Sequence, residues 1–345
     1  MAPHALDSIP TIDVEPLVRR FDDPGLGAFP DVRDVIEQLD HACRNIGFFY
    51  AAGHGVSREL MDDVRSLSHE FFKLPDCDKM RIKMTPSSGY RGYQKLGENV
   101  SYGMHDCHEA IDYFRELGPE IQDLELAKTV MGPNQWPENP KRFRAVMEDY
   151  VDQLRGLSKA ILRGVALALG GEADTFEGSR AGDPFWILRV IGYPPKDSLE
   201  SPESFGIGCG EHTDYGEIWI DINWSFFEFF VLTGLLTLVN QDPEIPALQV
   251  KNCSGKWLWA DPVPGTFVVN IGDMLKIWSN GTYQPTLHRV LNSAMDFRVS
   301  VPFFYEPNFD TKVEPLSFCL GNSKEEEKPV VYGEHLVKKV LTNFA

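Results

Sequence analysis

The first half of the chain combines helical hydrophobic periodicity with turn-rich segments. Residues 32–45 place apolar side chains three and four positions apart, which predicts an amphipathic helix. The apolar run GFFYAAGHGV follows and predicts a short strand closed by glycines. Ser57 is a typical N-cap for a second helix that ends before Pro75, and residues 140–170 predict a long third helix. Residues 86–137 are rich in turn residues, and we expect loops there.

From about residue 180 the pattern changes to short β-branched and aromatic runs cut by Gly, Pro, Asn and Asp. These runs are FWILRVIGYP, ALQVKN, KWLWA, GTFVVNIG, TLHRVLN and FRVSVPFFYEP. Many short strands between turns are typical of a sandwich or barrel. We therefore expect an α+β protein. A mostly helical N-terminal region (residues 1–170) should pack on an all-β domain (residues 171–310), and an acidic C-terminal tail (residues 311–345) should follow.

The composition is that of a globular protein with a strongly acidic surface. The 345 residues include 33 Lys and Arg against 51 Asp and Glu, which gives a formal net charge of −18. Such a surface repels nucleic-acid phosphates and anionic lipid, so we expect neither nucleic-acid nor membrane binding. The six cysteines lie far apart without a zinc or disulfide pattern, and the N-terminus lacks a signal-peptide pattern. We expect a cytoplasmic monomer.

One pair of polar residues in the predicted β region has the spacing of metal ligands. His212 and Asp214 are two residues apart, so on a strand both side chains point to the same face and can reach one ion. A distant histidine, His288 in TLHRVLN, could complete a set of two imidazoles and one carboxylate. This arrangement suits Fe(II) and leaves coordination positions for substrate and oxygen. Alone, the His-x-Asp spacing is a weak signal because it often arises by chance.

A second polar pair lies in the last predicted strand, FRVSVPFF. Arg298 and Ser300 are again two residues apart, so a guanidinium and a hydroxyl share one face of an apolar strand. An edge strand with a solvated arginine is the alternative interpretation. The flanking Phe and Val residues favour burial, and a buried guanidinium needs an anionic partner. A carboxylate ligand would supply it, because arginine binds carboxylates through two hydrogen bonds.

Ordered motifs along nearly the whole chain carry a family resemblance. They are IPTIDVEPL, CRNIGFFYAAGHGV, GYRGYQ, NQWP, IGYP, GEHTDYG, LLTLVNQD, LQVKN, NIGDMLKIWSNG, LHRV and RVSVPFFYEPNFD. With these motifs the chain resembles the Fe(II)/2-oxoglutarate-dependent dioxygenases of the isopenicillin N synthase-like group. The resemblance implies a double-stranded β-helix (jelly-roll) core. It also implies oxidation of a small molecule by O₂ with conversion of 2-oxoglutarate to succinate and CO₂.

The same resemblance implies roles for particular residues. The family's iron ligands, which are also its catalytic residues, correspond to His212, Asp214 and His288. Its pair that holds the distal carboxylate of 2-oxoglutarate corresponds to Arg298 and Ser300. Tyr193 in IGYP matches a tyrosine that contacts the co-substrate or the substrate in relatives. Packing of Tyr193 in the barrel is an equally good interpretation, because Ile191 replaces the Asn that many plant members have two residues earlier.

Two other functions fit the same motifs. Some members of the group are oxidases that need no 2-oxoglutarate, and turnover of labelled 2-oxoglutarate to succinate would distinguish them. A catalytically impaired binding protein is the second alternative, because an atypical insertion follows Asp214. The sequence does not identify the prime substrate.

The insertion comprises residues 217–234, EIWIDINWSFFEFFVLTG, where family members run from HTDYG directly into LLTLxNQD. As a surface loop its many Trp and Phe residues would form a large exposed apolar patch. We interpret it as a retained intron translated in frame, because its ends can be encoded by donor-like and acceptor-like sequences. We expect it to loop out as a hairpin, with LLTLV returning to the strand that continues from the ligands. Comparison of genomic DNA with cDNA tests this, and the interpretation is wrong if most transcripts keep the segment.

Deletion of residues 217–234 should improve the protein. Because the deletion removes exposed aromatic side chains and restores the family spacing after Asp214, we expect better monodispersity and higher iron-dependent 2-oxoglutarate turnover. The two proteins should be purified side by side and compared by size-exclusion chromatography and succinate release. Equal or better behaviour of the full-length chain would show that the segment is a functional element.

Overall fold

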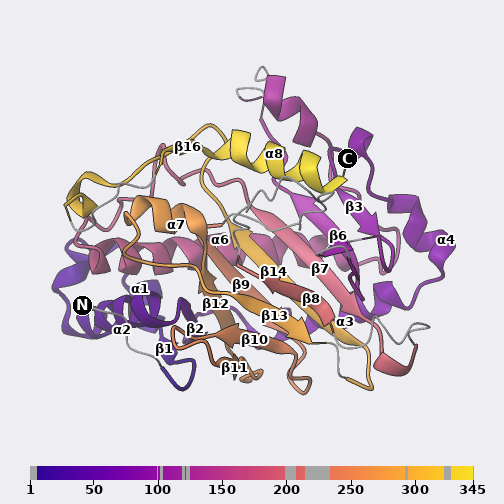
Figure 1. Ribbon diagram of the computed structural model, residues 1–345, viewed down its shortest axis with the longest axis horizontal. Helices are drawn as coiled ribbons and strands as arrows, with labels where there is room; N and C mark the ends of the chain where they lie inside the picture. The colour runs from indigo at the N-terminus through magenta and orange to yellow at the C-terminus, as the bar shows by residue number, and fades with distance from the viewer. Residues whose placement is uncertain are drawn as a thin grey trace.

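Two β-sheets lie at the centre of the molecule, with helices on the outside of the larger sheet (Figure 1). The large sheet has eight strands, in the order β1 (Thr11–Asp13), β2 (Phe48–Ala52), β12 (Phe267–Ile271), β9 (Leu236–Gln241), β14 (Arg298–Tyr305), β7 (Ile187–Tyr193), β6 (Glu109–Phe114) and β3 (Gly92–Gln94). The computed structural model describes residues 6–98, 100–101, 104–118, 121, 125–198, 207–213, 234–291, 294–321 and 328–344.

The smaller sheet contains the predicted metal-ligand histidines. Its four strands are ordered β11 (Trp257–Trp259), β10 (Leu248–Lys251), β13 (His288–Leu291) and β8 (Ile207–His212). All of its neighbours pair antiparallel. Two short pairs complete the described strands: β4 (Val100–Ser101) with β5 (Met104–His105), and β15 (Lys312–Val313) with β16 (Val330–Val331).

The large sheet has two different faces because side chains alternate along each strand. In β14, Val299, Val301 and Phe303 belong to the main apolar core, which the helices cover. The opposite face carries Arg298 and Ser300, and it packs toward the small sheet around a second, smaller apolar cluster. Both candidate co-substrate residues therefore lie between the two sheets, on what we call the inner face.

Three helices form where the hydrophobic pattern predicts them: α2 (Pro30–Asn45), α3 (Arg58–Phe72) and α6 (Phe143–Ala168). The sequence pattern does not predict the others, which are α1 (Glu15–Arg19), α4 (Asp76–Lys79), α7 (Asp273–Trp278) and α8 (Tyr332–Phe344). Ser57 caps α3 as predicted, since its Oγ accepts a hydrogen bond from the Leu60 amide at 3.1 Å. Helices α3 and α6 pack against β14. Among the described residues no helix has the length and apolar character that a membrane span needs.

Two chain regions contain more regular structure than the sequence pattern indicates. The turn-rich residues 86–137 also contain β3 and β6, which extend the large sheet. All six residues of β6 are buried, so the strand lacks the polar alternation that would have revealed it. The expected C-terminal tail forms α8, which packs against the 3₁₀ helix η4 (Glu125–Val130). The N-terminal region is thus helical but also supplies four strands of the large sheet.

The expected continuation of the ligand strand into LLTLV is wrong. Strand β8 ends at His212 in the small sheet, whereas β9 begins at Leu236 in the large sheet between β12 and β14. His212 is anchored by β13, not by β9. LLTLV does occupy a central strand, as expected. The expected hairpin falls on residues 214–233, which lie outside the described residues, and the insertion's last residue, Gly234, directly precedes Leu235 in the strand run.

Candidate active site

His212 and His288 lie side by side in the small sheet. They are register partners on β8 and β13, and their ring centroids are 4.2 Å apart. Nδ1 of His212 is 2.8 Å from the carbonyl of Gly210, and Nδ1 of His288 is 3.0 Å from the carbonyl of Thr286. A carbonyl can only accept, so Nδ1 carries the proton in both rings. The lone pair of each neutral imidazole is therefore on Nε2, the arrangement that metal-ligating histidines use.

The histidine pair packs against the apolar cluster of the inner face. The ring of Phe48, on β2, packs edge-on against His288 with centroids 5.3 Å apart. Phe48 belongs to the inner-face apolar cluster. The third predicted ligand, Asp214, lies outside the described residues, and in the described part of the chain no three metal-binding side chains gather. The structure thus brings together two of the three predicted ligands, and their donor set fits a divalent metal such as Fe(II).

Arg298 is a buried cation with unused hydrogen-bonding capacity. Only 2% of its surface is exposed, and burial lowers the pKa of its guanidinium. Its Nε and Nη1 atoms are buried and make no well-formed hydrogen bond to any described residue, although the nearby Tyr193 side chain acts to raise its pKa. Such donors are rare in folded proteins and need an explanation. A bound carboxylate would satisfy both, so Arg298 fits the distal end of 2-oxoglutarate.

Gln241 fixes the orientation of Arg298. Its Oε1 accepts a hydrogen bond of 2.8 Å from Nη2 of Arg298, and it lies opposite Ser300 in the β9–β14 register. Gln241 is not among the residues predicted from the sequence, although it belongs to the quoted motif LLTLVNQD. Its side chain leaves Nε and Nη1 of Arg298 for another ligand.

Tyr193 and Ser300 complete the described surroundings of Arg298. Tyr193 is its register partner on β7, and the guanidinium carbon lies 4.9 Å from the tyrosine ring centroid. Burial raises the pKa of Tyr193, which keeps the phenol neutral. Ser300 is 5% exposed on the same face. The histidine pair and Arg298 therefore both pack against the inner-face apolar cluster, His288 through Phe48 and Arg298 through Tyr193.

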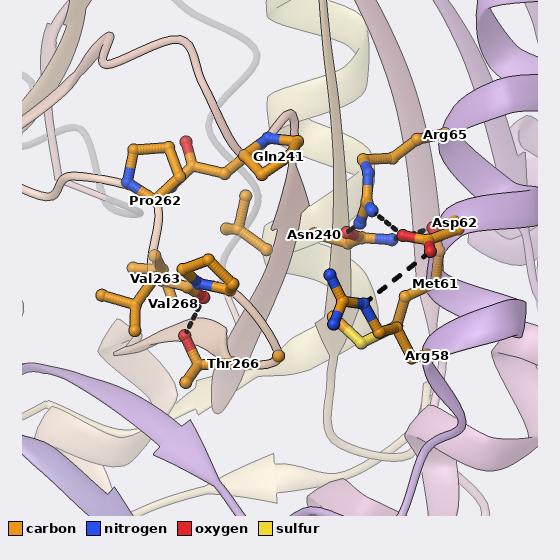
Figure 2. A pocket seen from close by; sticks show the side chains of 14 residues that line it. Arg58, Met61, Asp62, Arg65, Asn240, Gln241, Pro262, Val263, Thr266 and Val268 are labelled. Carbon is orange, nitrogen blue, oxygen red and sulfur yellow. Dashed lines mark hydrogen bonds and ion pairs between the residues drawn. The ribbon is translucent and has the colours of Figure 1, made fainter.

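A separate pocket lies at the end of β9, next to α3 (Figure 2). Its lining includes Arg58, Asp62, Arg65, Asn240, Gln241 and Thr266. Arg65 bridges Asn240 and Asp62, as the dashed lines show (Figure 2). Of the candidate site's described residues the pocket shares only Gln241, so it lies beside the co-substrate anchor and away from the histidine pair.

Two family profiles match the chain. Residues 9–139 match the family described as "non-haem dioxygenase in morphine synthesis N-terminal". Residues 227–307 match the 2OG-Fe(II) oxygenase superfamily. The second match includes His288, Arg298 and Ser300, and it begins inside the insertion, after His212 and Asp214.

Curated relatives are similar over nearly the whole chain. A homoarginine-6-hydroxylase of Oryza sativa subsp. japonica is 52% identical over 98% of both chains. A homoarginine-6-hydroxylase of Glycine max is also 52% identical, over 98% of this chain and 97% of its own.

Solved structures share the fold. A full-length Neurospora crassa protein in complex with alpha-KG and thymine superposes with a TM-score of 0.76 at 26% identity, over 96% of both chains. JOX2 in complex with 2OG, Fe and JA has a TM-score of 0.73 at 28% identity, over 97% of this chain and 85% of its own. These likenesses confirm the predicted fold, a jelly-roll core with a largely helical N-terminal part.

Replacement of either histidine, His212→Ala or His288→Ala, should abolish iron binding and activity. The fold should persist because both side chains lie at the edge of the apolar cluster. Iron titration, succinate release and circular dichroism measure the three properties, with the exposed His41→Ala as control. Wild-type turnover of either variant at saturating Fe(II) would show that the ligand assignment is wrong.

Replacement of Arg298 should weaken 2-oxoglutarate binding without affecting the metal. Loss of a buried charged contact typically costs about 2–5 kcal/mol. The KM for 2-oxoglutarate of Arg298→Ala should therefore rise about 30-fold or more, while the iron titration stays unchanged. Arg298→Lys keeps the charge but not the two-pronged geometry, so it should fall in between. An unchanged KM in Arg298→Ala would remove this residue from the co-substrate site.

Proposed function

Because the chain belongs to the 2OG-Fe(II) oxygenase superfamily, we propose that it hydroxylates a guanidino amino acid of the homoarginine type. The protein is an Fe(II)- and 2-oxoglutarate-dependent dioxygenase that oxidises a small molecule with release of succinate and CO₂. The observation that supports the substrate class is the 52% identity to homoarginine-6-hydroxylases over 98% of this chain.

We assign the metal to His212, Asp214 and His288. The backbone carbonyls of Gly210 and Thr286 support this assignment, because they hold both imidazoles in the tautomer with a lone pair on Nε2. The antiparallel pairing of β8 with β13 places the two rings side by side. When bound, iron and 2-oxoglutarate supply the oxidising chemistry, in which one atom of O₂ goes to the substrate and one to succinate.

We assign the distal carboxylate of 2-oxoglutarate to Arg298 and Ser300, with Tyr193 beside them. The support is the burial of Arg298, two of whose donors have no hydrogen-bond partner among the described residues, and the hydrogen bond that its Nη2 donates to Oε1 of Gln241. Because the site is buried, an ion pair with the co-substrate would be much stronger than in water. Arg298 therefore orients the co-substrate, and the apolar residues around it exclude water from the reaction.

The other proposals concern the setting in which the enzyme works. We propose that it acts as a cytoplasmic monomer on a small molecule, with no nucleic-acid or membrane partner. The support is the net charge of −18, which disfavours binding to nucleic-acid phosphates and anionic lipid. The impaired-protein alternative rests on the insertion after Asp214, and the deletion variant described above distinguishes it.

A succinate-release assay tests the substrate. With Fe(II) and 2-oxoglutarate present, homoarginine should stimulate succinate release from the protein lacking residues 217–234. Arginine is one methylene shorter, and such a difference changes kcat/KM by about 10- to 200-fold. Lysine, which lacks the guanidino group, and chelation of the metal serve as controls. Stimulation by another compound but not by homoarginine would contradict the proposal.

A further inference from the structure

A cluster of polar side chains lies between the two sheets. It is on the β6 side of Tyr193, whereas Arg298 is on the β14 side. It comprises Gln94, His108, Asp112 and Arg189, all at least nine-tenths buried. Asp112 and Arg189 are register partners on β6 and β7, and Arg189 alternates in phase with Tyr193. The cluster therefore lies on the same inner face as the co-substrate residues.

Hydrogen bonds and burial fix the protonation of the cluster. Nη1 of Arg189 donates to Oδ2 of Asp112 at 2.9 Å, and its Nη2 donates to Oε1 of Gln94 at 3.0 Å. Nδ1 of His108 is 2.9 Å from the carbonyl of Gly208, so Nδ1 is the donor and Nε2 can accept from Arg189 at 3.3 Å. Burial and the charge of Arg189 lower the pKa of His108 to about 3, so this ring stays neutral. Burial raises the pKa of Asp112 to about 6, which leaves the carboxylate ionised at neutral pH.

One atom of the cluster has no hydrogen-bond partner among the described residues. It is Oδ1 of Asp112, a residue that is 0% exposed. An unsatisfied buried carboxylate oxygen is costly and calls for an explanation. Arg298 shows the same property with opposite charge, on the same face of the same sheet. If the unpartnered donors of Arg298 suit an anionic co-substrate, the unpartnered acceptor of Asp112 suits a cationic group.

A homoarginine-type substrate has two cationic groups, the guanidino group and the α-ammonium group. The position of the cluster indicates which of them it would bind. The carbonyl of Gly208 accepts the hydrogen bond from His108. Gly208 is four residues before His212 on β8, so the two residues are about 13 Å apart along the strand. The guanidino group is bonded directly to the reacting carbon, C6, so it must lie next to the metal. The α-ammonium group lies four carbon–carbon bonds farther away, and its hydrogen-bond partner is expected on the order of 10 Å from C6. The cluster, which His108 joins to β8 at Gly208, therefore suits the remote ammonium group better than the guanidino group.

We propose that Asp112 binds the α-ammonium group of the amino-acid substrate through Oδ1, with Arg189 holding the carboxylate in place. This inference rests on the proposed function. It makes Asp112 the residue that distinguishes an α-amino acid from the same guanidino acid without the amino group.

The test compares two compounds in two variants. Homoarginine and 6-guanidinohexanoic acid differ only in the α-amino group. Asp112→Asn should lower kcat/KM for homoarginine by about tenfold to a hundredfold, and should leave that for 6-guanidinohexanoic acid nearly unchanged. The KM for 2-oxoglutarate should not change. Glu109→Gln is the matched control, because Glu109 is on the same strand in a buried ion pair with Lys79 at 2.7 Å, but on the opposite face. It should not discriminate between the compounds.

Each outcome of this comparison either supports or overturns the proposed role of Asp112. An equal loss for both compounds in Asp112→Asn would mean that the ion pair only supports the fold, and the proposal would be overturned. A wild-type protein that turns over both compounds with equal kcat/KM would also overturn the proposal, whether or not Asp112→Asn folds. If the protein turns over homoarginine but Asp112→Asn shows no loss of kcat/KM specific to homoarginine, only the role of Asp112 is overturned. Turnover of neither homoarginine nor any other amino acid overturns the proposed function as well.

Discussion

The strict alternation of side chains in the large sheet is the constraint on which the rest of the structure depends. One face of β14 carries Val299, Val301 and Phe303 into the helix-covered core, and the other carries Arg298 and Ser300 toward the small sheet. A shift of one residue in register would exchange these faces and place a guanidinium in the apolar core. Pairing with both β7 and β9 prevents such a shift, because the strand is fixed on two sides. The position of the chemistry thus follows from the packing of the core.

The inner face separates opposite charges along the sheet. Arg298 presents unpartnered donors at the end of β14, and Asp112 presents an unpartnered acceptor on β6. Tyr193 lies between them, with its ring near that of His108 at 5.7 Å between centroids and near the guanidinium of Arg298. In the proposed arrangement the co-substrate carboxylate binds at the positive end and the ammonium group of the substrate binds at the negative end. Such a field orients a charged ligand before any catalytic step.

The sequence predicts elements whose pattern is local and fails where burial is complete. Helices α2, α3 and α6 follow from apolar spacing and from the Ser57 cap. Strand β6 has no alternation to reveal it, because it is buried on both faces. His212 and His288 could be named from motifs, but their pairing depends on register. The bonds of Arg298 to Gln241 and of Arg189 to Asp112 span 57 and 77 residues, and no local pattern encodes them.

The position of β8 gives the two halves of the site unequal local stability. Among the described strands β8 is outermost in the small sheet and is hydrogen-bonded to β13 alone, whereas β14 has a partner on each side. Backbone amides of an edge strand exchange with solvent through small local openings, while those of a central strand exchange only when much of the sheet opens. An opening confined to β8 would displace His212 and leave Arg298 in place. Loss of activity on heating can therefore precede unfolding, in a protein that still retains its anchor for the co-substrate.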